Sequence, residues 1–293
     1  MISIIIPFYN EEKNLPLLYQ QIIAVMKKEK LNFELIFVND GSTDKPSLVV
    51  DEAVAVTINH RKRLGKGRAL LTGFENSKGD IIAFIDADLQ NDPQDLPKLI
   101  KKINDGYDFV NGWRKDRKDP LAKTLPSSIF NTLLLKIFLQ SKFHDINCGL
   151  KVMKRSVLEE IPLYGDNYRF LPVISEKEGF KTTEVIITHR KRQYGRSKYG
   201  FFRLFFGLWD TLTTYFIYKF VEKPLHFFGV VGSLFLLIGF IIAFILSIQR
   251  LFFGVLLYRR PILLLDVLLI VVGIQVTLTG IIGELIVYIH KKK

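Results

Sequence analysis

The chain has 293 residues, of which 48% are hydrophobic, a formal net charge of +12 and a single cysteine, Cys148. One cysteine excludes an internal disulfide framework and a cysteine-based zinc site, and we expect Cys148 to be a small buried residue. The mean hydropathy of +0.20 is high for a wholly soluble protein. The positive charge suits nucleic acid or an anionic membrane surface. The hydropathy makes a membrane the simpler partner, without nucleic acid.

Strand-like apolar runs alternate with helical patterns through about the first 190 residues. Strands are predicted at Ile2–Asn10, Phe33–Asp44, Asp80–Gln90, Tyr107–Trp113 and Thr182–His189. Helices are predicted at Arg68–Gly79 and at Asp92–Gly106. This alternation predicts an α/β domain with a mostly parallel, Rossmann-like sheet. The ligands of such sheets bind beyond the carboxyl ends of the strands.

Polar side chains gather where the predicted strands end. They are Tyr9, Asn10 and Glu11, then Asn39 and Asp40, then Asp86, Asp88 and Gln90, and finally Asn111 and Arg114. Because the carboxyl ends of parallel strands meet at one edge of a sheet, we expect these side chains to form a ligand or metal site.

Two carboxylates, Asp86 and Asp88, stand one residue apart at the end of an apolar run. In an extended chain both would point to the same face. Two carboxylates at close range repel unless a proton or a cation lies between them, and a hard divalent cation is the natural candidate. The alternative is a strand end followed by a polar turn and a helix N-cap.

Other motifs are weaker. The stretch Arg63–Gly73 contains glycines but lacks the spacing of a P-loop and follows no convincing strand, so we reject a P-loop. The chain has no G-x-S-x-G motif, and its five histidines have no zinc-binding spacing.

Two apolar runs near the C-terminus predict transmembrane helices. Leu225–Ser247 contains no Asp, Glu, Lys or Arg. At about 1.5 Å per residue it spans roughly 35 Å, enough for a hydrocarbon core of about 30 Å. The second run, Pro261–Ile289, holds Asp266 and Glu284 near its ends. The flanking basic residues place the N-terminal domain and both termini on the cytoplasmic side of the cell membrane.

Two further segments, Pro126–Phe143 and Phe201–Phe220, are amphipathic, and we interpret the second as an interfacial helix. We therefore expect a cytoplasmic catalytic domain over residues 1–200, an interfacial helix over 201–222 and a membrane domain over 223–293.

Three motifs in order, IIIPFYNEE, VNDGSTD and FIDADLQNDP, resemble those of the inverting nucleotide-sugar glycosyltransferases with the GT-A fold. DINCGLKVMKR, RQYGRSKYG and the two apolar runs extend the resemblance to the branch of dolichyl-phosphate mannose synthase and the bacterial polyprenyl-phosphate glucosyltransferases. The resemblance implies transfer of a sugar, with inversion, from a nucleotide sugar to a polyprenyl monophosphate. It implies Mg²⁺ or Mn²⁺ as cofactor. The expected donor is a UDP-sugar such as UDP-glucose, with GDP-mannose as the competitor.

The same resemblance assigns roles to individual residues. For the donor they are Pro7, Tyr9, Glu11 and Asp40 at the nucleoside, Asp86, Ala87 and Asp88 at the diphosphate, Asp88 and Gln90 at the metal ion, and Arg192 and Lys198 at the phosphates. For the acceptor phosphate they are Arg114, Lys123 and Ser127, with Asp145 orienting the acceptor or the sugar, or capping a turn. Lys123 stands where we expect an arginine, which keeps the charge but loses the bidentate fork. A lipid phosphate is largely dianionic at neutral pH and needs no protein base.

The alternatives are a processive polysaccharide synthase and a non-catalytic membrane adaptor that keeps the fold. The synthases resemble one another in a Q-x-x-R-W motif, which is absent here. Both carboxylates of the D-A-D motif are present, which argues against an adaptor. A nucleotidyltransferase would need a glycine-rich N-terminal loop that this chain lacks. The sequence does not identify the sugar or the base, and it leaves open whether the chain forms a homo-oligomer.

Overall fold

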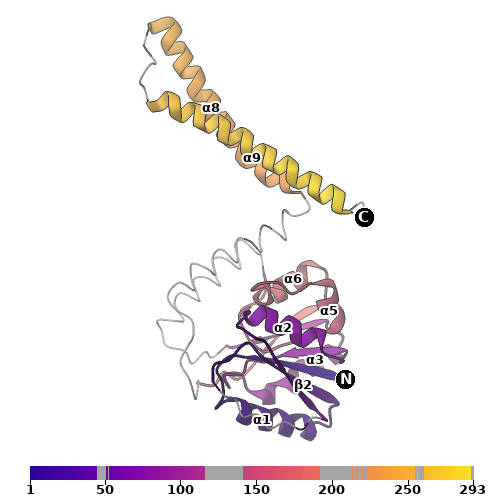
Figure 1. Ribbon diagram of the computed structural model, residues 1–293. Helices are drawn as coiled ribbons and strands as arrows, with labels where there is room; N and C mark the ends of the chain where they lie inside the picture. The colour runs from indigo at the N-terminus through magenta and orange to yellow at the C-terminus, as the bar shows by residue number, and fades with distance from the viewer. Residues whose placement is uncertain are drawn as a thin grey trace. The chain divides into compact units, whose positions relative to one another are not determined.

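The computed structural model describes residues 1–44, 51, 53–115, 141–191, 213, 216, 220, 223–254, 256 and 261–291. The chain divides into two units, Met1–Thr211 and Leu212–Lys293, each described here by itself (Figure 1). Most of residues 126–143 and 201–222 lies outside the described residues. The two amphipathic segments and the three-part division of the chain therefore stay predictions.

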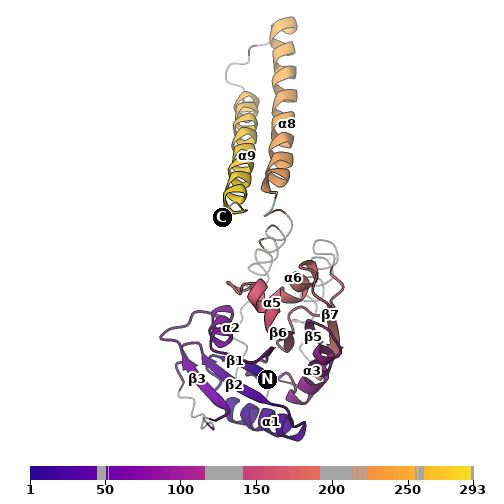
Figure 2. The same cartoon turned by 90° about the vertical axis from the view of Figure 1, so that its right-hand side faces the viewer.

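The first unit is built on a seven-stranded sheet with the order β3-β2-β1-β4-β6-β5-β7 (Figure 2). The strands are β1 (Ile2–Phe8), β2 (Phe33–Asn39), β3 (Ala55–Asn59), β4 (Ile81–Phe84), β5 (Phe109–Trp113), β6 (Lys151–Lys154) and β7 (Thr182–Ile186). Neighbouring strands run parallel, except that β6 is antiparallel to both β4 and β5. The prediction of a mostly parallel α/β sheet is confirmed.

Helices cover both faces of this sheet. The helical elements are α1 (Leu15–Lys28), α2 (Lys66–Glu75), the 3₁₀ turn η1 (Pro93–Asp95), α3 (Leu96–Asn104), α5 (Arg155–Glu160), the 3₁₀ turn η3 (Asn167–Arg169) and α6 (Leu171–Lys177). Leu18 of α1 and Leu99 of α3 share one buried core with Ile4 of β1. Ile5 contacts Gly73 of α2 on the opposite face. Because β1 is covered on both faces, its sequence is a continuous apolar run rather than an alternating one.

Two strands, β3 and β6, were not predicted. β3 lies at an edge of the sheet and is partly exposed, so it lacks a continuous apolar run. β6 is only four residues long, with a lysine at each end. Since β3 ends shortly before the stretch Arg63–Gly73, our statement that no strand precedes this stretch is wrong. The mismatch in spacing still excludes a P-loop.

The strand predicted over Asp80–Gln90 is too long, because β4 ends at Phe84. The chain turns at Ala87 and Asp88, and Leu89 has a φ of 60°. Strand alternation therefore does not place Asp86 and Asp88 on one face, and this part of our interpretation is wrong. β6 pairs only with Ile81–Phe84 of this segment, so the following residues are released from the antiparallel ladder.

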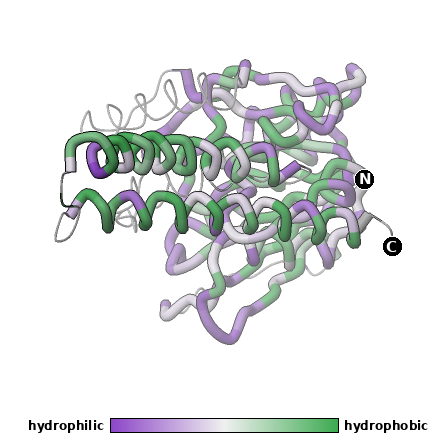
Figure 3. The backbone as a smooth tube through the Cα atoms, turned by 90° about the horizontal axis from the view of Figure 1, so that it is seen from above, coloured by the Kyte–Doolittle hydropathy of each residue, from purple (hydrophilic) through white to green (hydrophobic). Residues whose placement is uncertain are grey.

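The second unit contains α8 (Pro224–Phe253) and α9 (Pro261–Lys291). Both are long and apolar enough to cross a membrane, over Pro224–Phe253 and Pro261–Ile289. Figure 3 shows that the two helices are hydrophobic along most of their length. They pack against each other closely: a Cβ added at Gly232 would lie 2.8 Å from the carbonyl oxygen of Gly273. Small residues at such a crossing allow the two backbones to approach.

We predict that Gly232→Ala weakens the packing of α8 on α9. A methyl group at Gly232 meets the backbone of α9, and overpacking of this kind costs about 1–3 kcal/mol. Gly229→Ala is the matched control, because a Cβ there lies 3.6 Å from its nearest neighbour, a side-chain atom of Leu225. The midpoint of unfolding in SDS, followed by far-ultraviolet circular dichroism, should fall only for Gly232→Ala. Equal midpoints for the two variants would contradict the described packing.

Candidate active site

The predicted polar residues do gather at one edge of the sheet. Tyr9 and Asn10 follow β1, Asp40 follows β2 and Arg114 follows β5, and these three strands run in the same direction. Because β6 runs the opposite way, its first residue, Lys151, also lies at this edge. We call it the polar edge.

Asp86 is paired with Lys66, the first residue of α2. The Lys66 ammonium donates a hydrogen bond to Asp86 Oδ1, and both side chains are about a quarter to a third exposed. Burial by itself would raise the pKa of Asp86, but Lys66 and then Arg114 outweigh it and hold this pKa below its ordinary value. The sequence analysis did not identify Lys66. Its signal was a lysine between two glycines at the start of a helix.

Two glycines bring backbone against this ion pair. A Cβ at Gly67 would lie 1.8 Å from the carbonyl oxygen of Gly165, so the start of α2 packs directly on the loop before η3. A Cβ at Gly149 would lie 2.3 Å from Asp86 Oδ2. Gly149 therefore allows the loop before β6 to contact the Asp86 carboxylate.

Asp88 and Gln90, the predicted metal ligands, lie in the turn after β4. Asp88 Oδ1 accepts a hydrogen bond of 3.2 Å from the Gln90 backbone N–H. The Gln90 carbonyl oxygen accepts one of 2.8 Å from the backbone N–H of Arg190, and Asn91 forms a β-bridge with His189. The described part of the basic stretch 189–198 thus runs beside the predicted metal ligands.

Four predicted site residues, Lys123, Ser127, Arg192 and Lys198, lie outside the described residues. Their assigned contacts stay predictions. Among the described residues, no three His, Cys, Asp or Glu side chains form a group that could hold a metal ion.

The predicted nucleoside residues surround the loop before α2. Asp40 is buried, and its carboxylate accepts hydrogen bonds from the backbone N–H groups of Leu64, at 2.7 Å, and Gly65, at 2.9 Å. The guanidinium of Arg63 lies 4.5 Å from the ring centroid of Tyr9. Asp40 therefore anchors the loop that covers Tyr9.

The other predicted donor residues are placed less informatively. Pro7 is buried within β1, and Ala87 is buried in the turn after β4. The Glu11 carboxylate accepts a hydrogen bond from the side-chain amide of Asn14, just before α1.

Arg114 and Asp145 form a two-pronged ion pair. Arg114 Nε donates to Asp145 Oδ2 at 2.7 Å, and Arg114 Nη2 donates to Asp145 Oδ1 at 3.0 Å. The two side chains are only 10% and 6% exposed. Although burial would lower the pKa of Arg114, the hydrogen bonds and charge of Asp145 raise it above its ordinary value. Asp145 is thus placed to hold and orient Arg114.

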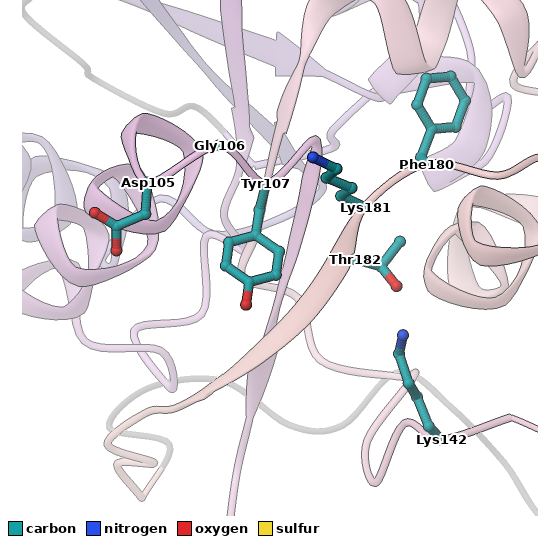
Figure 4. Close-up of a pocket in the computed structure, with 7 residues that line it drawn as sticks. All are labelled: Asp105, Gly106, Tyr107, Lys142, Phe180, Lys181 and Thr182. Atoms are coloured by element: carbon teal, nitrogen blue, oxygen red, sulfur yellow. The ribbon is translucent and has the colours of Figure 1, made fainter.

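Two cavities lie near the described surface. One of about 410 Å³ is lined by the start of α2 and by Leu163–Asp166. The other, of about 480 Å³, is shown in Figure 4 and is lined by residues that include Tyr107 and Lys181. Because Tyr107 precedes β5 and Lys181 precedes β7, this second cavity lies at the edge opposite the polar edge. We therefore do not assign the site to it.

Comparison with known proteins identifies the family. Residues 3–162 match the model described as Glycosyl transferase family 2. The chain belongs to this family. The membership confirms the resemblance drawn from the three ordered motifs and makes the chain a glycosyltransferase.

Two curated relatives match this family 2 chain over 97% of its length. One is undecaprenyl-phosphate 4-deoxy-4-formamido-L-arabinose transferase from Photorhabdus laumondii, 34% identical, with 88% of its length covered. The other is dodecaprenyl-phosphate galacturonate synthase from Rhizobium johnstonii, 33% identical, with 87% covered.

Among solved structures, glucosyl-3-phosphoglycerate synthase from Mycobacterium tuberculosis with phosphoglyceric acid is similar in fold. The match has a TM-score of 0.59 at 20% identity and covers 73% of this family 2 chain and 79% of that chain. This similarity supports the GT-A fold.

We predict that Cys148 alkylates slowly in the folded protein. Its side chain is 1% exposed, and burial raises the pKa of the thiol to about 11. At pH 8 the reactive thiolate is therefore scarcer than in an unfolded chain, where the thiol pKa is about 8.5. Iodoacetamide labelling measured by mass spectrometry should be at least tenfold slower before unfolding than after it. Equal rates would contradict the burial.

We also predict that Gly149→Ala destabilises the protein through Asp86. The added methyl group would displace the carboxylate, at a cost of about 1–3 kcal/mol. In an Asp86→Ala background this clash is absent, so the same substitution should cost less there. Chemical unfolding of the wild type, both single variants and the double variant gives the coupling between the two positions. Strict additivity would mean that Gly149 matters for another reason.

Proposed function

We propose that this protein transfers a sugar from a nucleotide sugar to a polyprenyl monophosphate, with inversion at the anomeric carbon. The observation that carries the proposal is the polar edge itself. Asp86, Asp88 and Gln90 lie there with the cations Lys66 and Arg114, in a family 2 glycosyltransferase. Such an edge offers oxygen ligands for a metal ion and positive charge for phosphates.

The acceptor class is supported by the two curated relatives, whose names specify undecaprenyl and dodecaprenyl phosphate. Both matches extend over almost the whole chain, including the two apolar helices. A polyprenyl phosphate is a membrane lipid, so an enzyme that uses it must work at a membrane surface. We therefore propose that α8 and α9 cross the cell membrane and that the catalytic unit and both termini are cytoplasmic.

The donor sugar is less constrained. The relatives named for a formamido-arabinose and for galacturonate are 34% and 33% identical to this chain, so similarity does not choose between them. Glucose and mannose stay in the panel to be tested, together with a 4-aminated pentose and a hexuronate.

The residues fit a divalent cation as cofactor. Mg²⁺ in nucleotide sites usually takes one or two carboxylates and completes its shell with phosphate oxygens and water. Asp88 and Gln90 supply hard oxygen donors on the same turn. When bound, the cation would neutralise charge on the departing nucleoside diphosphate as a Lewis acid. Lys66 holds positive charge at Asp86 beside it.

The geometry also suggests how the acceptor is held. Arg114 uses Nε and Nη2 to bind Asp145, while Nη1 takes no part in that pair. We propose that Asp145 fixes the guanidinium so that its remaining N–H groups meet the acceptor phosphate at a set angle. Because both Asp145 oxygens accept from Arg114, this carboxylate is not placed to act as a general base. A phosphate dianion does not require one.

The proposal is tested by a transfer assay with the purified full-length protein in lipid nanodiscs. Radiolabelled UDP- and GDP-sugars are supplied with undecaprenyl phosphate or with free undecaprenol. We expect product only with the phosphate, loss of product in EDTA and recovery with Mg²⁺ or Mn²⁺. Asp88→Asn should lower turnover at least 100-fold, whereas Asp80→Asn should not, because Asp80 is 87% exposed and pairs with the chain's N-terminus.

Three results would contradict the proposal. Transfer to free polyprenol as fast as to its phosphate would remove the anionic nucleophile. Full activity in chelator would exclude the metal. No transfer with any donor, although the protein binds a nucleoside diphosphate, would reject the reaction.

A further inference from the structure

Lys151, the first residue of β6, is a buried lysine at the polar edge that the sequence analysis assigned no role. Its side chain is 2% exposed. Among the described residues its ammonium contacts no carboxylate, and its hydrogen bonds go to Asn111 Oδ1 and to the Ile146 carbonyl oxygen. Burying an ammonium without a carboxylate partner is unfavourable, and a methionine would fill similar space without that penalty. Packing alone therefore does not account for a lysine here.

The two hydrogen bonds of Lys151 determine the position of the loop that carries Asp145. Nζ lies 2.8 Å from the Ile146 carbonyl oxygen and 2.9 Å from Asn111 Oδ1. The Asn111 amide nitrogen in turn donates to the Asp145 carbonyl oxygen at 2.7 Å. Two consecutive carbonyl groups, those of Asp145 and Ile146, are thus held from below by β5 and β6.

The same loop is held from a third strand. Glu184 of β7 accepts hydrogen bonds from the backbone N–H groups of His144, at 2.9 Å, and Asp145, at 3.3 Å. With its backbone fixed on both sides, Asp145 presents its carboxylate to Arg114 in one orientation. A guanidinium bound through two nitrogens takes up the orientation of its carboxylate.

The charge of Lys151 also matters at this place. Burial lowers the pKa of Lys151 to about 8, and the nearby Asp145 carboxylate opposes this, so the ammonium form predominates at neutral pH. Lys66, Arg114 and Lys151 together outnumber the carboxylates of Asp86 and Asp145. An excess of fixed positive charge beneath the edge favours anionic phosphate groups.

We infer that Lys151 is a positioning residue for Arg114: through Asn111 and the backbone of Asp145–Ile146, it fixes the guanidinium that receives the acceptor phosphate. The inference rests on the proposed function, because it gives Arg114 its acceptor. Lys151 itself touches neither substrate. Its removal should therefore impair use of the lipid phosphate while the nucleotide is still bound.

The test compares Lys151→Met and Lys151→Arg with Lys154→Met in the full-length protein in nanodiscs. Lys154 is the matched control, since it lies at the other end of β6, is 42% exposed and pairs with Asp108. We expect Lys151→Met to lower kcat/KM for undecaprenyl phosphate at least tenfold, Lys151→Arg to recover part of the loss and Lys154→Met to change it less than twofold. The calorimetric Kd for UDP or GDP with Mg²⁺ should stay within threefold of the wild type.

Two further measurements separate positioning from a general structural role. Cys148, in the same loop, should alkylate as slowly in Lys151→Met as in the wild type. In an Arg114→Lys background, Lys151→Met should cost less than threefold, because the group that it positions is already changed.

The inference is overturned if Lys151→Met keeps its use of the acceptor. It is also overturned if nucleotide affinity and Cys148 protection are lost together with activity, or if the losses multiply in the Arg114→Lys background. An inactive wild type is a separate outcome. It would reject the proposed function first, and this inference would fall with it.

Discussion

The antiparallel direction of β6 is the constraint on which the polar edge depends. In a wholly parallel sheet, each strand delivers only the residues that follow it to the ligand-binding edge. β6 instead delivers the residues that precede it, because its beginning lies at that edge. The loop containing Asp145 and Gly149 therefore meets the ends of β4 and β5, where it contacts Arg114 and Asp86. If β6 were reversed, this loop would lie on the far side of the sheet.

A second consequence is that the carboxylates of this edge are matched with cations before any ligand binds. Asp86 has Lys66, and Asp145 has Arg114. Paired charges of this kind do not collapse the local structure by repulsion, and they leave the edge positive rather than acidic. A site for nucleoside diphosphate needs this balance, since it must accept a metal ion and a polyanion together. The two cations come from different elements, so their placement depends on the fold.

The sequence predicted much of this architecture, and the reasons for its failures are physical. β1 and β2 were predictable because burial on both faces leaves an unbroken apolar run. β6 was not, because four residues flanked by lysines carry no periodicity. The turn after Asp86 was missed because Leu89 takes a positive φ without a glycine to signal it. Arg114 and Asp145 were both identified from the family motifs. Their pairing was not, since they lie 31 positions apart and no local pattern couples them.

The two glycines next to the Lys66–Asp86 pair have different consequences for how this sequence can vary in evolution. At Gly149 the obstacle is the side chain of Asp86, so a larger residue becomes acceptable once position 86 changes, and the two positions should vary together among homologues. At Gly67 the obstacle is the backbone carbonyl of Gly165. A substitution elsewhere does not remove a carbonyl group. Position 67 should therefore stay glycine even in homologues that have lost the chemistry, and it marks the fold, whereas position 149 marks the site.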